Sequence, residues 1–149
     1  MPRYSLVIDH ERCWGCKTCE VACKQEFRSP EGVRLISVEE VGPGMVEDKL
    51  EFVFHVNVCR HCDDPPCVAA CQDEAITRRD DGIVVLDEER CTGCQLCMTV
   101  CPYEAIAFDS AKSVARKCNL CHHRVDQGLY PACADNVCLA HCIHLRSGF

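Results

Sequence analysis

The apolar positions of this chain fall into short, separated runs. Four of them are rich in residues that favour β-structure, at positions 6–8, 51–58, 83–86 and 105–108. Runs of this length predict short strands rather than long helices or extended sheets. No apolar stretch approaches the length of about 18 residues that indicates a transmembrane helix, so we expect no membrane span.

A short helical turn is predicted to begin at the last two cysteines of each cysteine-containing segment. Residues 19–27 are an example of such a turn. Residues 28–50 contain two apolar runs around the sequence Val41-Gly-Pro-Gly44. Glycine and proline mark turns, so we interpret this segment as an inserted hairpin or loop. Short strands combined with short helices and long loops predict an α+β fold.

Cysteine dominates the composition. The chain has 149 residues and 17 cysteines, and its hydrophobic fraction of 48% includes them. Without the cysteines, only about a third of the chain remains for apolar packing, which is little for a core of its own. A domain with so small a core depends on covalent or metal links, so we expect the protein to fold around an inorganic centre.

The charge and the N-terminal sequence narrow the functional class. The formal net charge of −7 argues against nucleic acid as a partner, because a phosphate-binding surface needs a basic excess. Residues 1–10 contain neither a secretory apolar region nor a twin-arginine signal, so we expect a cytoplasmic protein. Structural disulfides are rare in that compartment, which leaves metal binding as the reason for the cysteines.

The cysteines form four groups along the sequence. These are Cys13, Cys16, Cys19 and Cys23; Cys59, Cys62, Cys67 and Cys71; Cys91, Cys94, Cys97 and Cys101; and Cys118, Cys121, Cys133, Cys138 and Cys142. Groups one and three have the bacterial ferredoxin spacing for 4Fe–4S clusters, in which the fourth cysteine binds the neighbouring cluster. Zinc sites instead close with four ligands from CxxC pairs or Cys/His mixtures. The spacing therefore predicts iron–sulfur clusters.

Sixteen cysteines would hold four 4Fe–4S clusters, and one cysteine is left over. The last two cysteines of groups one to three are separated by three residues, and Cys138 and Cys142 repeat that spacing. On this pattern Cys133 is the spare cysteine. The alternative makes Cys133 the third ligand of group four, with Cys138 or Cys142 as the last.

The sequence also contains an internal repeat. Residues 9–23 match residues 87–101 at an offset of 78, with eight of fifteen positions identical. Groups two and four match each other more loosely. The order is therefore A-B-A′-B′, which predicts four half-ferredoxin units in one chain.

Four such groups, the second reading Arg60-His-Cys-Asp-Asp-Pro-Pro-Cys67, resemble the four-cluster iron–sulfur subunits of molybdenum and tungsten oxidoreductases. That superfamily includes the electron-transfer subunits of dimethyl sulfoxide reductase, polysulfide reductase and formate dehydrogenase. The resemblance covers residues 8–142. The compact size and unusual fourth group are most similar to the small subunits that accompany tungsten aldehyde oxidoreductases or benzoyl-CoA reductases.

The resemblance implies crossed ligand sets, in which groups one and four exchange their last cysteines, as do groups two and three. The implied sets are Cys13, Cys16, Cys19 and Cys142; Cys118, Cys121, Cys138 and Cys23; Cys59, Cys62, Cys67 and Cys101; and Cys91, Cys94, Cys97 and Cys71. The single domain 1–149 would then consist of two packed dicluster ferredoxin-like modules. One module comprises about residues 1–27 with 110–149, and the other comprises residues 51–109.

The same resemblance implies a non-catalytic subunit. It would relay single electrons between a large tungsten- or molybdenum-pterin catalytic subunit, which interconverts aldehydes and carboxylic acids, and a flavoprotein or ferredoxin. The alternatives are the iron–sulfur subunit of another molybdopterin or benzoyl-CoA reductase complex, a stand-alone polyferredoxin, and a redox sensor. The lack of a DNA-binding segment counts against the sensor.

Cluster charge adds one expectation. An oxidised 4Fe–4S cluster with four thiolates carries about −2, so four clusters make the protein strongly anionic. Reduction potentials should therefore be low unless N–H···S bonds and nearby cations offset the charge. We interpret the basic pairs Arg78-Arg79 and Arg116-Lys117 as charge compensation.

Overall fold

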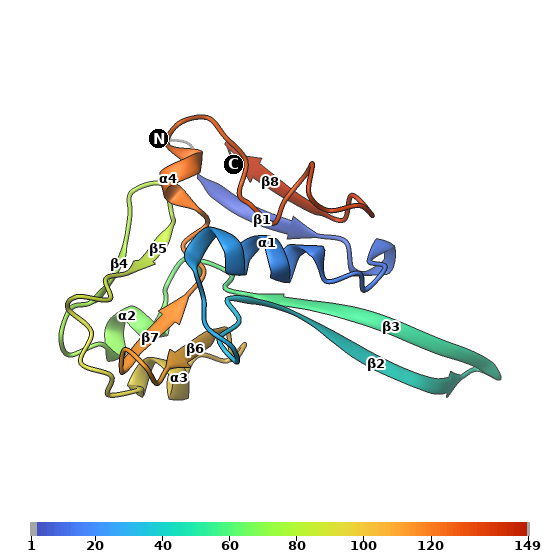
Figure 1. Cartoon of the computed structure of the whole chain (residues 1–149), viewed down its shortest axis with the longest axis horizontal. Coiled ribbons are helices and arrows are strands. Elements are labelled where there is room, and N and C mark those ends of the chain that lie inside the picture. Colours follow the sequence, from blue (N-terminus) through green and yellow to red (C-terminus); the bar gives the residue numbers. More distant parts are fainter. Residues whose placement is uncertain (1–2, 149) are drawn as a thin grey trace.

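The computed structural model describes residues 3–148 and consists of short strands and helices joined by long loops (Figure 1). In chain order the elements are β1 (Tyr4–Ile8), the 3-10 helix η1 (His10–Arg12), α1 (Thr18–Phe27), β2 (Ile36–Val46), β3 (Lys49–Val58), α2 (Pro66–Ala70), β4 (Ile76–Arg78), β5 (Val84–Leu86), α3 (Leu96–Val100), β6 (Ile106–Asp109), β7 (Val114–Lys117), α4 (His122–Val125) and β8 (Ile143–Ser147). This is the small mixed architecture that the sequence predicts.

The strands form four separate antiparallel pairs, β1–β8, β2–β3, β4–β5 and β6–β7. The β1–β8 pair joins the two ends of the described chain, with Tyr4 opposite Ser147 (Figure 1). Group one follows β1 and group four precedes β8. The pairing therefore brings the first and last cysteine groups together, and the Asp9 N–H donates to the Cys142 carbonyl at 2.8 Å.

Three of the helices carry cysteines near their ends. Helix α1 contains Cys19 and Cys23, while α2 and α3 contain Cys67 and Cys97 near their starts. Cys71 and Cys101 are the C-caps of α2 and α3. One turn of helix thus separates the two cysteines of each pair, and the structure confirms the short helices predicted there.

Strands β2 and β3 form one long hairpin that projects from the body of the molecule (Figure 1). At its base Ile36, Val38 and Val56 are buried, whereas Met45 and Leu50 near the tip are exposed. The hairpin spans residues 36–58. The sequence pattern places a hairpin or loop at residues 28–50, so the observed hairpin lies further along the chain and includes the run 51–58 as its second arm.

Cysteine side chains take part in both hydrophobic clusters of the interior. One cluster combines Ile36, Val38 and neighbouring residues with cysteines of groups one and four. The other combines Ile76, Val84 and Ile106 with Cys67 and Cys97. The interior is thus built partly of thiols, as the small apolar fraction indicates. In the part of the chain that the structure describes, no helix is long and apolar enough to cross a membrane.

Candidate iron–sulfur cluster sites

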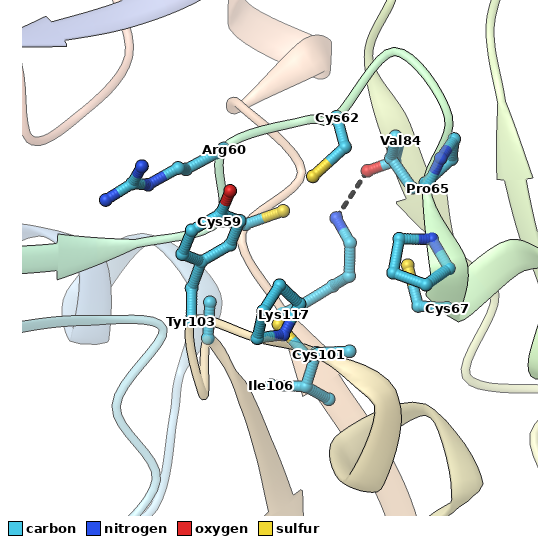
Figure 2. A pocket seen from close by; sticks show the side chains of 13 residues that line it. Cys59, Arg60, Cys62, Pro65, Cys67, Val84, Cys101, Tyr103, Ile106 and Lys117 are labelled. Atoms are coloured by element: carbon cyan, nitrogen blue, oxygen red, sulfur yellow. Dashed lines mark hydrogen bonds between the residues drawn. The ribbon is translucent and has the colours of Figure 1, made fainter.

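Four cysteines line a cavity between the loop that precedes α2 and the end of α3 (Figure 2). Cys59, Cys62 and Cys67 come from group two and Cys101 comes from group three. Pro65, Val84 and Ile106 contribute apolar walls. We call this cavity, defined by its four cysteines, the Cys59 cavity. It brings together one complete set of ligands that the sequence analysis implied for a cluster.

A second cavity has the complementary composition. It is lined by Cys71 from group two and by Cys91, Cys94 and Cys97 from group three. We call it the Cys71 cavity. Helix α2 has Cys67 near its start and Cys71 at its end, so one short helix supplies a thiol to each cavity. Among residues 3–148, no three His, Cys, Asp or Glu side chains are arranged to hold a single metal ion.

The backbone approaches other groups closely at the loops of groups one and three. Gly93 has a φ of +77°, and a Cβ built on it would lie 2.3 Å from the Ser113 carbonyl oxygen. Gly15 has a φ of +68°, and its Cβ would meet the Phe54 ring at 2.3 Å. Only glycine adopts such a conformation freely and leaves this space open. These loops therefore fit the tight wrapping that a cluster needs.

Backbone N–H groups point at several thiols. The donor–sulfur pairs are His61–Cys59 at 3.5 Å, Ala75–Cys71 at 3.3 Å, Ala115–Cys91 at 3.4 Å, Leu120–Cys118 at 3.3 Å and Cys142–Cys138 at 3.4 Å. Hydrogen bonds of this kind stabilise sulfur that carries negative charge, as it does when bound to iron. The donor set and its surroundings fit an iron–sulfur cluster.

Burial makes four of the cysteine thiols weaker acids when no metal is bound. Desolvation raises the pKa of Cys19, Cys23 and Cys118 to about 12 and that of Cys97 to about 11. The thiol forms of these four residues therefore dominate at neutral pH in the metal-free protein. Iron can bind only as these groups lose their protons, which couples cluster binding to pH.

Group four contains two candidates for its third ligand, Cys133 and Cys138. Cys133 is buried, and desolvation raises its pKa well above the usual value. The nearby thiols of Cys118, Cys121 and Cys23 raise that pKa further. Cys133 therefore lies near Cys118, Cys121 and Cys23, the cysteines with which the alternative assignment groups it.

Cys138 lies instead beside Cys142, with their Sγ atoms 3.5 Å apart. Both side chains are buried, and the Cys13 thiol is close enough to add to the raised pKa of Cys142. The Cys138 thiol is in turn close enough to affect the pKa of Cys19. Cys138 and Cys142 of group four thus lie near group one. A cluster held by the first three cysteines of group one needs one more ligand, and either of these two could supply it.

The basic residues that the sequence analysis singles out have different partners. Arg79 forms ion pairs with Asp81 and Asp126 at 2.8 Å, so carboxylates balance its charge. Arg116 is paired with Glu88 at 2.9 Å. Lys117, in contrast, is buried in the wall of the Cys59 cavity, which Arg116 does not line. The sequence, in which the two residues are neighbours, does not indicate this difference.

Comparison with known proteins identifies iron–sulfur domains in this chain. A 4Fe–4S dicluster domain model matches residues 50–147, and a 4Fe–4S binding domain model matches residues 6–28. The B subunit of tetrathionate reductase from Salmonella typhimurium is 40% identical over 139 residues, which cover 90% of this chain and 54% of the relative.

Two further relatives are also similar to this protein over most of its length. A putative iron–sulfur B subunit of dimethyl sulfoxide reductase from Halobacterium salinarum is 37% identical, covering 91% of this chain and 63% of the relative. The B subunit of polysulfide reductase from Wolinella succinogenes is 36% identical, covering 88% of this chain and 70% of the relative. The matched part spans less than two thirds of the first two relatives. This protein belongs to the 4Fe–4S dicluster family of ferredoxin-type iron–sulfur proteins.

Proposed function

We propose that this protein is the iron–sulfur subunit of a molybdopterin-type reductase complex and passes single electrons through four 4Fe–4S clusters. The observation that carries the proposal is the composition of the two cavities. Each is lined by four cysteines drawn from two different groups, in the crossed pattern of a dicluster ferredoxin. The proposal assigns no catalytic residue to this protein itself.

The proposed ligand sets follow the arrangement of the thiols. They are Cys59, Cys62, Cys67 and Cys101; Cys71, Cys91, Cys94 and Cys97; Cys23, Cys118, Cys121 and Cys133; and Cys13, Cys16 and Cys19 with Cys142 or Cys138. When bound, the clusters supply one-electron redox chemistry. The protein holds them with thiols, stabilises the sulfur charge with N–H donors and limits water with apolar walls.

Short helices fix the relative positions of two sites. Helices α2 and α3 pack against each other, and each has a cysteine of the Cys59 cavity and a cysteine of the Cys71 cavity at opposite ends. Two clusters held in this way would stay close without any moving part. Cys16 of group one and Cys94 of group three are exposed. We propose that electrons enter and leave near these two cysteines.

The partners are inferred from the relatives. Tetrathionate, dimethyl sulfoxide and polysulfide reductases each include a B subunit similar to this protein. We infer a large pterin-metal catalytic subunit on one side and a second carrier, a ferredoxin or flavoprotein, on the other. The relatives favour a reductase. The experiment below also tests an aldehyde-oxidising tungsten partner.

The test is anaerobic purification through a tag on this protein, followed by metal analysis and cluster spectroscopy. We expect molybdenum or tungsten to co-elute with a large subunit. Dithionite-reduced clusters should then be reoxidised by tetrathionate, dimethyl sulfoxide or polysulfide through that subunit, and not in a control without substrate. Reduction of oxidised clusters by an aldehyde would assign the partner to the aldehyde class instead. Recovery of the protein alone, reducible only by chemical reductants, would contradict the complex and favour a free polyferredoxin.

A further inference from the structure

One buried cation stands beside the predicted cluster sites. Lys117, the last residue of β7, is 5% exposed and lines the Cys59 cavity. Its Nζ donates to the Val84 carbonyl at 2.5 Å and to the Cys118 carbonyl at 2.6 Å. Figure 2 shows this nitrogen pointing into the same space as the sulfur atoms of Cys59 and Cys62. Two carbonyls and the cavity thus fix the ammonium in place.

The charge of Lys117 has no carboxylate partner within residues 3–148, because both of its hydrogen bonds are to carbonyl oxygens. The preceding residue makes the contrast clear. Arg116 is equally buried, yet it pairs with Glu88 at 2.9 Å and with Asp109 at 3.5 Å. Burying an ammonium without a counter-charge costs several kcal/mol, on the order of the desolvation penalty for one ion. An anion in the adjoining cavity would offset that cost.

Lys117 also connects the Cys59 cavity with the group-four site. It lines that cavity, and its Nζ donates to the carbonyl of Cys118, a ligand proposed for group four, at 2.6 Å. The ammonium therefore lies beside the Cys59 cavity and is held by the backbone of the neighbouring site.

The Cys71 cavity has no such cation among the described residues that line it. The polar side chains in its wall, apart from the cysteines, are those of Asp73 and Gln95. The two cavities share α2 and α3, and they differ in the charge beside them. A positive charge favours the reduced, more negative form of a cluster, and a carboxylate disfavours it.

We propose that the Lys117 ammonium is a fixed counter-charge that raises the reduction potential of the cluster in the Cys59 cavity. This makes that cluster the electron acceptor of its pair. In the step itself, the Cys71-cavity cluster loses one electron and the Cys59-cavity cluster gains it. No bond forms or breaks. The proposal rests on the proposed function, because it requires clusters at both cavities.

The test is a redox titration of the anaerobic holoprotein followed by electron paramagnetic resonance, in three variants. In Lys117→Met, the equilibrium constant for reducing one cluster should fall at least tenfold, which is about 59 mV for a one-electron couple. Lys117→Arg keeps the charge and should leave that potential near the parental value. Lys112→Met removes a lysine that is 60% exposed, so water screens its charge and no potential should move.

The iron content of each variant shows whether the proposed function or only the proposed role of Lys117 is wrong. If the parent protein lacks clusters, the proposed function itself fails. If Lys117→Met keeps all its iron and no potential changes, only the role of Lys117 fails. Equal shifts in Lys117→Met and Lys117→Arg would also overturn that role, because charge would not be the cause. If the methionine variant loses iron, Lys117→Gln, which retains a donor group, takes its place. Loss of the cluster in both neutral variants would overturn the proposal in favour of a structural role.

Discussion

Removing the iron should unfold the protein. The β-structure consists of two-stranded pairs, and a single hairpin is at best marginally stable alone. Both hydrophobic clusters of the interior include cysteine side chains, so the metal-free protein would lose the links that join its distant segments. Because the proposed cluster ligands come from different groups, binding and folding should be one event.

We expect anaerobic treatment with an iron chelator to abolish the far-UV circular dichroism signal and the cooperative thermal transition. Reconstitution with iron and sulfide under reducing conditions should restore both, which separates unfolding from chemical damage. A metal-free protein that keeps a cooperative transition would show that its apolar core is sufficient. In that case the inference from composition would be wrong.

Replacing Cys133 should remove one whole cluster. Cys133 lies with Cys118, Cys121 and Cys23, whereas Cys138 lies beside Cys142. Cys133→Ser should therefore lose about four iron atoms or leave a three-iron cluster with its own paramagnetic resonance signal. The matched control is Cys138→Ser, which removes an equally buried thiol.

The control should retain full iron, because Cys142 lies 3.5 Å from Cys138 and can serve as the fourth ligand of the neighbouring site. Iron and sulfide analysis of both variants makes the comparison. The reverse result, with Cys133→Ser intact and Cys138→Ser depleted, would restore the assignment suggested by the three-residue spacing. It would also remove Cys133 from the proposed ligand set.

Local sequence patterns predict the parts of this protein in which neighbouring residues act together. The tight loops at Gly15 and Gly93 and the helices that follow them are compact units, so spacing alone indicates their form. Group four is different. Eleven residues, which include α4, separate Cys121 from Cys133, and no local rule states which later thiol returns to the site.

Contacts between distant parts of the chain account for the other differences between the sequence predictions and the structure. The composition of residues 51–58 predicts a strand, but only the folded structure shows that β2 is its partner. Arg116 and Lys117 are alike in sequence as neighbouring basic residues. They differ in the structure because successive side chains of β7 have different surroundings, a carboxylate pair for Arg116 and the Cys59 cavity for Lys117.

The central claim is a four-cluster relay, and the most direct measurement is the iron and acid-labile sulfide content of anaerobically purified protein. Four 4Fe–4S clusters predict about 16 iron atoms and as many sulfides per molecule. Zinc in place of iron would contradict the cluster chemistry. A reproducible value of about eight iron atoms, with full occupancy shown by spectroscopy, would contradict the four-cluster relay and leave only one pair of clusters.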